Sequence, residues 1–278
     1  MHRGLFEGES GMTLLEVKDI MFCYPGGKPA VAGVEIMADR GEKIAVIGQN
    51  GSGKTTLSKL LNGLLKPDSG YIYVDGEPTE KKTTAQISKK VGYVFQNPDD
   101  QIFNQTVYKE IAYTLKRQKK PRFEIEERVK KAAELTGITE SLEENPYDLS
   151  FSLRKFVTIA SVVAAEPEII ILDEPTAGQD AQGLVLLGRI VRQLAGQGKL
   201  VIVITHDMDF VCENFERVIV MANGKILMDG KTEDAFCHRE VLEQASLKPP
   251  SITELAEELK IVPPVITLGQ FIQHFTKP

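Results

Sequence analysis

Residues 48 to 55 read Gly48-Gln49-Asn50-Gly51-Ser52-Gly53-Lys54-Thr55, which fits the pattern G-x-x-x-x-G-K-[ST]. A short apolar run at 43–47 precedes this stretch, and a helical periodicity of Thr56, Leu57, Leu60, Leu61 and Leu64 follows it. Glycines between a strand and a helix let backbone N–H groups surround a phosphate, and the helix N-terminus adds partial positive charge. We therefore predict a loop that binds nucleotide phosphates, in which Lys54 reaches the β- and γ-phosphates and Thr55 binds Mg²⁺.

A second chemical feature is the acidic end of an aliphatic run, Ile169-Ile170-Ile171-Leu172-Asp173-Glu174-Pro175. Such a run is typical of a strand buried in a parallel sheet, and ligands bind at the carboxyl ends of these strands. We expect Asp173 to bind Mg²⁺ and Glu174 to orient or polarise an attacking water molecule. An acidic pair after a strand is, on its own, also typical of a helix N-cap. The phosphate loop upstream favours the catalytic interpretation.

The composition limits the class of protein. The chain has 278 residues, of which 42% are hydrophobic and 26% charged, and its net charge is -6. These values exclude a disordered chain, a collagen-like repeat and a coiled-coil rod, and the negative charge gives no reason to expect nucleic-acid binding. The three cysteines, Cys23, Cys212 and Cys237, lack the spacing of a zinc site or a disulfide framework, which fits a reducing cytosol. No apolar stretch approaches the roughly 20 residues that a membrane-spanning helix needs.

The periodicity along the chain predicts an α/β phosphate-loop fold with a mixed sheet and a helical insertion. Strands are expected at 15–22, 31–37, 43–47, 71–74, 91–95, 168–172, 200–204, 217–221 and 225–228, with 31–37 antiparallel to the first strand and a hairpin at Asn223-Gly224. Helices are expected after Lys54 and over 107–136, 152–165 and 181–195. We expect a flexible lead-in at 1–12, a core at 13–230 into which a helical subdomain is inserted at about 97–165, and a helical C-terminal extension at 231–278.

Four motifs in order resemble those of the ATP-binding subunit of ABC transporters: the phosphate loop, Leu-Asp-Glu-Pro-Thr at 172–176, Ala-Gly-Gln-Asp at 177–180 and Thr-His-Asp at 205–207. The resemblance covers about residues 13–230 and implies an ABC-type nucleotide-binding domain that hydrolyses ATP with Mg²⁺. It implies that Tyr24 stacks on adenine, that Gln96 links Mg²⁺ and water to the transport partner, and that His206 lies at the γ-phosphate. The implied nucleotide contacts are Tyr24, Gly48, Gln49, Asn50, Gly51, Ser52, Gly53, Lys54, Thr55, Thr56, Ser150 and Asp180. The implied catalytic residues are Glu174, His206, Gln96 and Lys54, and the implied metal ligands are Thr55, Gln96 and Asp173.

Two of these residues have ordinary alternatives when they are taken alone. A lone tyrosine such as Tyr24 is more often a packed strand residue, and a lone histidine such as His206 is more often part of a capped turn. Their functional interpretation therefore depends on the other motifs.

A narrower resemblance involves Gln96-Asn97-Pro98-Asp99-Asp100-Gln101, Thr106-Val107 and the tail segment Leu247-Lys248-Pro249-Pro250-Ser251. These segments look like those of the ATPase subunits of energy-coupling factor transporters, which import vitamins and transition-metal ions. The resemblance implies a location at the cytoplasmic face of the membrane and a transmembrane coupling protein, which in turn carries a small substrate-binding membrane protein. It places the surface for the coupling protein around Gln96 and the helical insertion.

The signature segment departs from the family pattern. Where the family has L-S-G-G-Q, this chain has Leu149-Ser150-Phe151-Ser152-Leu153. In the family this segment covers the γ-phosphate held by the opposite subunit, and the side chains at 151 and 152 should crowd that approach. Because the chain's own ATP-binding residues are intact, we expect a heterodimer with a related ATPase whose regular signature completes this chain's site. A homodimer that tolerates the altered signature is the alternative.

Two other functions compete with an importer subunit. A soluble ABC-type ATPase that is not coupled to transport would be expected to show a long coiled-coil insertion, two cassettes in one chain or a basic surface, and none is present. A small-molecule kinase would not explain Gln96, the signature-like segment and His206 together. The apolar pattern at 252–275 predicts a helical face that packs on a dimer partner or on the chain itself.

Overall fold

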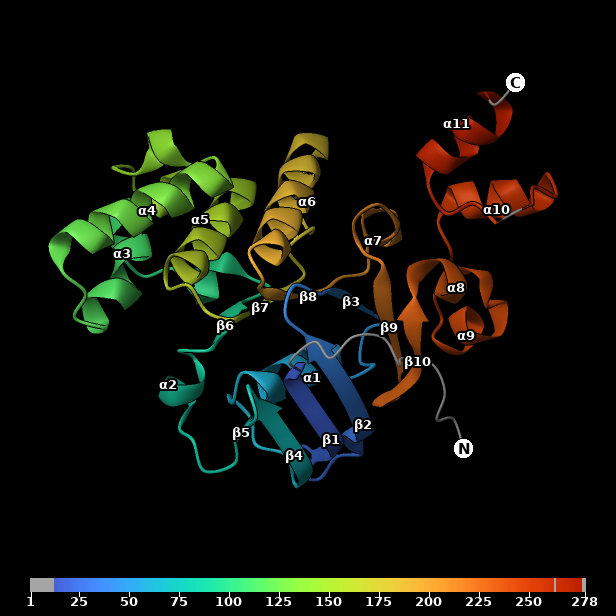
Figure 1. Ribbon diagram of the computed structural model, residues 1–278, viewed down its shortest axis with the longest axis horizontal. Coiled ribbons are helices and arrows are strands. Elements are labelled where there is room, and N and C mark those ends of the chain that lie inside the picture. The colour runs from blue at the N-terminus through green and yellow to red at the C-terminus, as the bar shows by residue number, and fades with distance from the viewer. Residues whose placement is uncertain (1–12, 263, 277–278) are drawn as a thin grey trace.

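The computed structural model describes residues 13–262 and 264–276, so the predicted lead-in at 1–12 lies outside the described residues. Two sheets form the middle of the molecule (Figure 1), one with the strand order β2-β1-β4-β5 and one with the order β10-β9-β3-β8-β7-β6. The strands are β1 (Thr13–Cys23), β2 (Pro29–Asp39), β3 (Lys43–Ile47), β4 (Ser69–Val74), β5 (Glu77–Pro78), β6 (Val91–Val94), β7 (Ile169–Asp173), β8 (Leu200–Ile204), β9 (Arg217–Ala222) and β10 (Lys225–Lys231).

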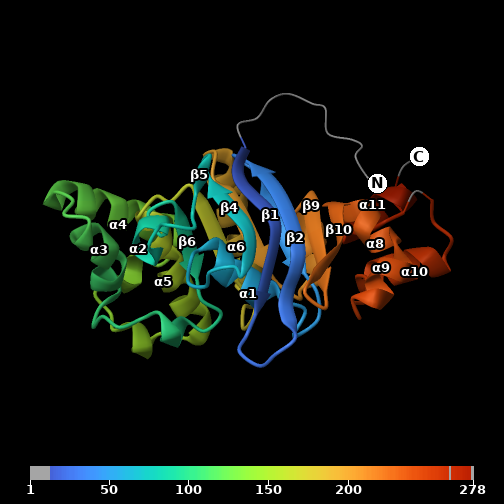
Figure 2. The ribbon, with the colours of Figure 1, turned by 90° about the horizontal axis from the view of Figure 1, so that it is seen from below.

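Helices lie between the two sheets, beside the larger sheet and at both ends of the molecule (Figure 1). They are α1 (Lys54–Leu61), α2 (Thr84–Ile87), α3 (Val107–Arg117), α4 (Arg122–Thr136), α5 (Phe151–Ala164), α6 (Ala181–Gly196), α7 (Met208–Asn214), α8 (Thr232–Cys237), α9 (Arg239–Gln244), α10 (Ser251–Glu258) and α11 (Leu268–Thr276). Figures 1 and 2 place α3, α4 and α5 at one end and α8 to α11 at the opposite end. Within residues 13–262 and 264–276, no helix has the length and apolar character needed to span a bilayer.

The strand pairing confirms the predicted α/β class with a mixed sheet. β3 pairs in parallel with β8 and β9, and β7 pairs in parallel with β6 and β8, whereas β10 is antiparallel to β9. The predicted antiparallel pairing of β1 with β2 is confirmed. The predicted hairpin is also confirmed, because Asn223 and Gly224 join β9 to β10 with positive φ angles of 50° and 77°.

The central strand β8 separates two hydrophobic cores. Val201 and Val203 belong to the core that lies toward the helices, and Leu200, Ile202 and Ile204 belong to the core shared with the antiparallel sheet. Successive side chains of a strand point to opposite faces, so a strand that is covered on both faces must be apolar at every position. This explains why the sequence shows a continuous aliphatic run here.

Two of the predicted helical stretches require correction. The first helix ends at Leu61, because Gly63 adopts φ +75° and reverses the chain, and Leu64 is consequently exposed. The stretch predicted over 107–136 is divided into α3 and α4, because Lys119 adopts φ 57° and Pro121 starts the new helix. The short elements β5, α2 and α7 were not predicted from the sequence.

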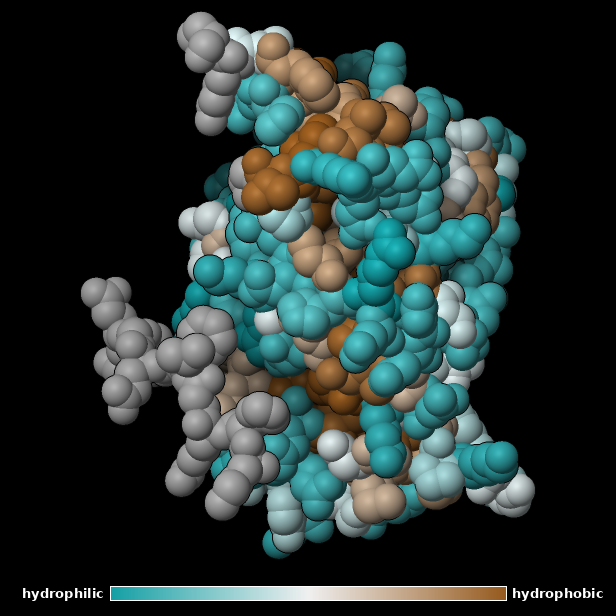
Figure 3. Space-filling model, turned by 90° about the vertical axis from the view of Figure 1, so that its right-hand side faces the viewer, coloured by the Kyte–Doolittle hydropathy of each residue, from teal (hydrophilic) through white to brown (hydrophobic). Residues whose placement is uncertain are grey.

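The C-terminal helices are joined to the core by apolar contacts. Phe236, Leu242 and Ala245 of α8, α9 and the residue after it are buried in the larger core. Within the 252–275 segment, Ile266 is buried in the same core, so this part of the segment packs on its own chain, one of the two predicted alternatives. Other apolar side chains of α10, α11 and their connection remain exposed, and Figure 3 shows apolar surface at this end of the molecule. They are Leu255, Leu259, Val262, Leu268, Ile272 and Phe275.

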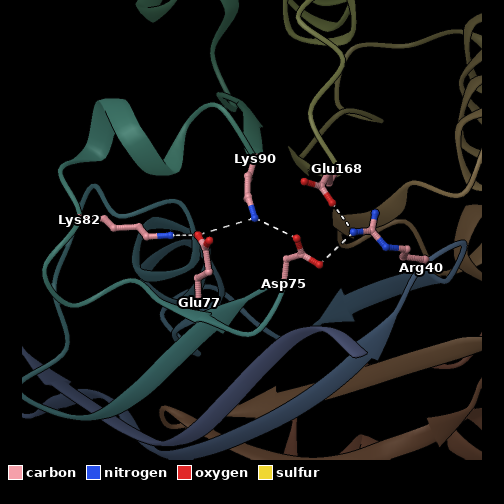
Figure 4. A network of polar contacts seen from close by, with 6 residues as sticks. All are labelled: Arg40, Asp75, Glu77, Lys82, Lys90 and Glu168. Atoms are coloured by element: carbon pink, nitrogen blue, oxygen red, sulfur yellow. Dashed lines mark hydrogen bonds and ion pairs between the residues drawn. The ribbon is translucent and has the colours of Figure 1, made fainter. Parts of the chain in front are cut away.

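An ion-pair network joins the two sheets near the amino ends of β6 and β7 (Figure 4). Lys90, just before β6, lies 2.9 Å from the Asp75 carboxylate, and Arg40 contacts both Asp75 and Glu168. Lys90 holds the pKa of Asp75 below its ordinary value, chiefly through the hydrogen bond between them. Because these side chains are partly exposed, the network contributes little to stability.

We predict opposite effects of alanine at two glycines. In Gly92→Ala the new Cβ would lie 2.5 Å from Val162 and 2.8 Å from Pro167, because α5 approaches β6 closely. This crowding should lower the free energy of unfolding by about 1–3 kcal/mol. Gly196, the last residue of α6, has open space around it, so Gly196→Ala should raise stability by about 0.4–1 kcal/mol. Urea unfolding of both variants checks this, and equal shifts would contradict the packing argument.

Candidate functional site

The phosphate loop joins β3 to α1 in a conformation that requires glycine. Gly53 adopts φ +105°, and a Cβ there would lie 2.4 Å from the carbonyl oxygen of Ala30. At Gly48 a Cβ would lie 2.3 Å from the carbonyl oxygen of Met221. Backbone atoms of the neighbouring strands thus lie so close to the loop that a Cβ would not fit at position 48 or 53. This explains why the pattern has glycine at both positions.

Lys54 folds back over the loop that precedes it. Its ammonium group donates hydrogen bonds to the carbonyl oxygens of Gly48, at 2.6 Å, and Gln49, at 3.0 Å. Burial lowers the pKa of Lys54, and the nearby Glu174 and Asp173 carboxylates oppose this shift. The loop thus carries a buried positive charge on its concave side, which suits the β- and γ-phosphates of a nucleotide.

Asp173 provides one oxygen that lacks a partner. It is the last residue of β7 and 1% exposed, and its Oδ2 accepts a hydrogen bond of 2.7 Å from the Tyr93 hydroxyl. Its Oδ1 is also buried, and no group within residues 13–262 and 264–276 hydrogen-bonds to it. Burial raises the pKa of Asp173, and the hydrogen bond from the Tyr93 hydroxyl and the nearby Lys54 charge oppose the shift. A buried carboxylate oxygen without a partner is a suitable ligand for Mg²⁺, so these residues fit the ion.

Glu174 follows in a left-handed backbone conformation, with φ 49°. Its N–H donates to the carbonyl oxygen of Ile204 at 2.8 Å, and its Oε2 lies 2.8 Å from Nδ1 of His206. Burial raises the pKa of Glu174, whereas His206 and Lys54 lower it. A carboxylate with a raised pKa accepts a proton more readily, which suits a base that activates water.

A cavity of about 270 Å³ lies beside the loop and gathers several of the predicted site residues. Its lining consists of Tyr24, Ala30, Asn50, Gly51, Gly53, Lys54, Thr55, Thr56, Gln96 and Glu174. The Tyr24 ring is 43% exposed, with its hydroxyl 3.4 Å from that of Thr56, and it packs against the ring of Phe22 edge to face. An exposed aromatic face beside a phosphate loop can stack on a purine.

A second cavity, of about 580 Å³, adjoins the first part of the loop. His206 lines it together with 48–50 and with the C-terminal segment 246–251. His206 therefore lines a cavity between the phosphate loop and the C-terminal extension.

Three predicted nucleotide contacts do not line these cavities: Ser52, which is buried within the loop, Ser150 and Asp180. Ser150 caps α5 by accepting the Leu153 N–H at 3.3 Å, and Asp180 caps α6 by accepting the Gly183 N–H at 2.7 Å. The structure thus gives both residues a local capping role. Neither lies with Lys54 in the site of this chain.

The altered signature segment packs on its own chain. The Ser152 hydroxyl donates to the Gln179 side-chain oxygen at 2.6 Å, and the Gln179 amide lies 3.4 Å from the Ser152 carbonyl oxygen. The Phe151 ring packs against Gly178, where an added Cβ would lie 2.8 Å from it. The start of α5 is thus attached to the loop that follows Glu174.

Sequence reasoning missed two residues of the site. Tyr93 looked like an ordinary strand residue, and Lys155 looked like one polar position in a helix. Lys155 is in fact 2% exposed, and its ammonium donates a hydrogen bond to the carbonyl oxygen of Glu174. The available signal was its position directly before the largely apolar stretch 156–160 of a predicted helix.

Together, the phosphate loop, the paired acids after β7 and the histidine after β8 define a nucleotide-binding cassette. A family model described as "ABC transporter" matches residues 31–177. The energy-coupling factor transporter ATP-binding protein EcfA of Methanoculleus marisnigri is 42% identical over 250 residues, which cover 90% of each chain. A putative ABC transporter ATP-binding protein of Caldanaerobacter subterraneus is also 42% identical, over 91% of this chain, and here the chain spans 44% of the relative's length.

Among solved structures, cbiO1 of Clostridium perfringens, described as part of the ABC transporter complex cbiONQ, superposes with a TM-score of 0.76. It is 35% identical, and the alignment covers 88% of this chain and 99% of the other. The chain belongs to the ABC transporter ATP-binding family. It is an ATP-binding cassette ATPase whose ligands are ATP and Mg²⁺, and the predicted fold and family are confirmed.

We predict that Asp173→Asn separates stability from Mg²⁺ binding. A carboxyl group with a raised pKa contributes stability below its ordinary pKa and loses that contribution as the pH rises through the folded value. At pH 7 the buried carboxylate therefore costs stability, and the neutral amide should raise the free energy of unfolding by about 1 kcal/mol. The same variant should lose the increase in melting temperature that Mg²⁺ adds to that given by ATP alone. Retention of that increase would contradict the metal assignment.

Proposed function

We propose that this chain is the ATP-hydrolysing subunit of an energy-coupling factor importer for vitamins or transition-metal ions, at the cytoplasmic face of the membrane. The observation that supports it most is that Lys54 and the Glu174–His206 pair lie beside Asp173, whose buried Oδ1 has no hydrogen-bond partner among the described residues. The similarity to EcfA of Methanoculleus marisnigri and to cbiO1 supports the narrower class.

Each site residue has a role in this reaction. Tyr24 stacks on adenine, while the loop amides of 48–56 and the ammonium of Lys54 bind the phosphates. Thr55, Gln96 and Asp173 would hold Mg²⁺, which supplies positive charge against the phosphate oxygens when bound. Ser150 and Asp180 contribute from across a subunit interface, which agrees with their position outside this chain's cavities.

Hydrolysis depends on a base that is held in place. Glu174 accepts a proton from the water that attacks the γ-phosphate in line, and its raised pKa favours that transfer. His206 keeps the Glu174 carboxylate oriented through its Nδ1 contact and presents its exposed ring to the phosphate. Gln96 borders the same cavity and leads into the helical insertion, so it can transmit the state of the site to a partner.

The altered signature supports a heterodimer in which the two sites differ. Phe151 and Ser152 carry side chains where glycines would leave the backbone open, and both are engaged with Gly178 and Gln179 of their own chain. A segment occupied in this way covers the partner's nucleotide poorly. We therefore propose that a related ATPase with a regular signature completes the site of this chain, while the partner's own site turns over slowly.

Mixing experiments test this asymmetry. We expect the chain alone to hydrolyse ATP weakly and the mixture with the second ATPase to hydrolyse it well. Glu174→Gln in this chain should reduce the mixture's turnover by about 10²-fold or more. Restoring the signature with Phe151→Gly, Ser152→Gly and Leu153→Gln should about double turnover, because the second site becomes active. Full activity of the isolated chain would contradict the heterodimer.

The surface for a membrane partner is a groove of about 310 Å³ between the sheet and the helical insertion. Phe95, Gln101, Phe103 and Tyr113 are among its lining residues. Phe103 is 59% exposed and packs edge to face on Tyr113, with ring centroids 4.7 Å apart. The groove includes Phe95, the residue before Gln96, and its exposed aromatics support docking of the transmembrane coupling protein there, and through it a link to the substrate-binding membrane protein. We propose the 97–165 segment as this coupling subdomain, inserted into a 13–230 cassette and followed by the 231–278 extension.

A matched pair of charge substitutions tests the groove. Phe103→Asp should reduce recovery of membrane subunits with the tagged chain to about a tenth, because the charge disrupts an aromatic contact. Phe123→Asp is the control, since Phe123 is 71% exposed on α4 and does not line the groove. The measurement is affinity purification from detergent-solubilised native membranes. Equal recovery with both variants, or recovery of ribosomes instead, would favour an ATPase that is not coupled to transport.

A further inference from the structure

Lys155 is a buried lysine without a carboxylate in hydrogen-bond contact. It lies in the second turn of α5, is 2% exposed, and its ammonium donates to the carbonyl oxygen of Glu174. The same ammonium lies 5.4 Å from the centre of the Phe151 ring. Burial lowers the pKa of Lys155 to about 8, against the attraction of the Glu174 and Asp173 carboxylates. Such burial weakens the fold, and packing alone would be served equally by an apolar side chain of the same length.

Glu174, whose carbonyl oxygen Lys155 contacts, has an unfavourable backbone conformation. Glu174 adopts φ 49°, a left-handed conformation that is unfavourable for a residue other than glycine. The Glu174 N–H donates to the Ile204 carbonyl oxygen, and the Glu174 carbonyl oxygen accepts from the Lys155 ammonium and, at 3.4 Å, from the Ala177 N–H. Both ends of this residue are therefore fixed, which leaves its side chain aimed at His206, with 2.8 Å between Oε2 and Nδ1.

Two further contacts fasten the start of α5 to the same loop. The Ser152 hydroxyl donates a hydrogen bond of 2.6 Å to the Gln179 side-chain oxygen, and the Phe151 ring packs on Gly178. Together with Lys155, these contacts attach the start of α5 to 174–179 at separate points. The helix and the loop are therefore expected to move as one body.

We propose that Lys155 is a positioning residue for Glu174, whose buried ammonium holds the Glu174 peptide in its left-handed conformation and so keeps the carboxylate between His206 and the phosphate loop. This role rests on Glu174 acting as the base, as proposed above. Because α5 begins at the signature segment, Lys155 also connects the surface that faces the second ATPase to the base of this chain's own site.

Turnover of the mixed ATPases provides the first measurement. Lys155→Met keeps the length of the side chain and removes its charge, so kcat should fall about ten-fold or more while KM for ATP changes less than about two-fold. Lys155→Arg keeps a charged donor and should recover most of kcat. Thr158→Val removes another buried hydrogen bond of α5, in which the hydroxyl donates to the Lys155 carbonyl oxygen at 2.7 Å, and should leave kcat unchanged.

Hydrogen exchange on the isolated chain provides the second measurement and needs no partner. The peptide covering 174–180 should exchange about ten-fold faster in Lys155→Met than in the wild type, and at the wild-type rate in Lys155→Arg and Thr158→Val. Wild-type exchange in Lys155→Met would overturn the positioning role, as would equal losses of kcat in Lys155→Met and Thr158→Val. Full turnover of Glu174→Gln would instead disprove the proposed base, while the exchange rates would still decide whether Lys155 holds the loop.

Discussion

The site depends on one constraint, the parallel register of β3, β8 and β7, whose carboxyl ends meet at a single edge. Backbone hydrogen bonds continue past the strands, because the Thr205 N–H donates to the Val46 carbonyl oxygen at 3.3 Å and the Glu174 N–H to the Ile204 carbonyl oxygen at 2.8 Å. These main-chain contacts bring together the phosphate loop, His206 and the acidic pair Asp173 and Glu174. A slip of one residue would turn each functional side chain to the opposite face of the sheet, so the packed cores on both faces protect the chemistry.

The same edge concentrates buried charge. Asp173 and Glu174 have raised pKa values because they are buried, and Lys54 and Lys155 have lowered ones for the same reason. The opposite charges offset part of each penalty, yet one oxygen of Asp173 still lacks a partner. This buried charge lowers the free energy of unfolding of the chain by itself. The same charges are complementary to a polyphosphate and its cation, so the site gives up stability in order to bind its ligand.

The departures from the family signature have a structural counterpart within the chain. Phe151 and Ser152 use the side chains that glycine would lack to contact Gly178 and Gln179, and Lys155 continues the contact to Glu174. The first turns of α5 thus contact residues 174–179 of their own chain. In the family pattern described above, the signature segment contacts the nucleotide of the opposite subunit. This attachment is the structural basis of the asymmetric pair of sites proposed above, because a segment that is engaged in its own chain is less available to a neighbour.

The sequence alone determined the phosphate loop, the buried strands with their acidic end and the hairpin at Asn223, because each is encoded by spacing within a few residues. It was less successful with α1 and with the break at Pro121, where an apolar periodicity masked the local breakers. Only the tertiary structure decided the partners of Asp173, Glu174 and Gln179. Their contacts join residues 80, 19 and 27 positions apart, and such pairs follow from how strands and helices pack rather than from any local pattern.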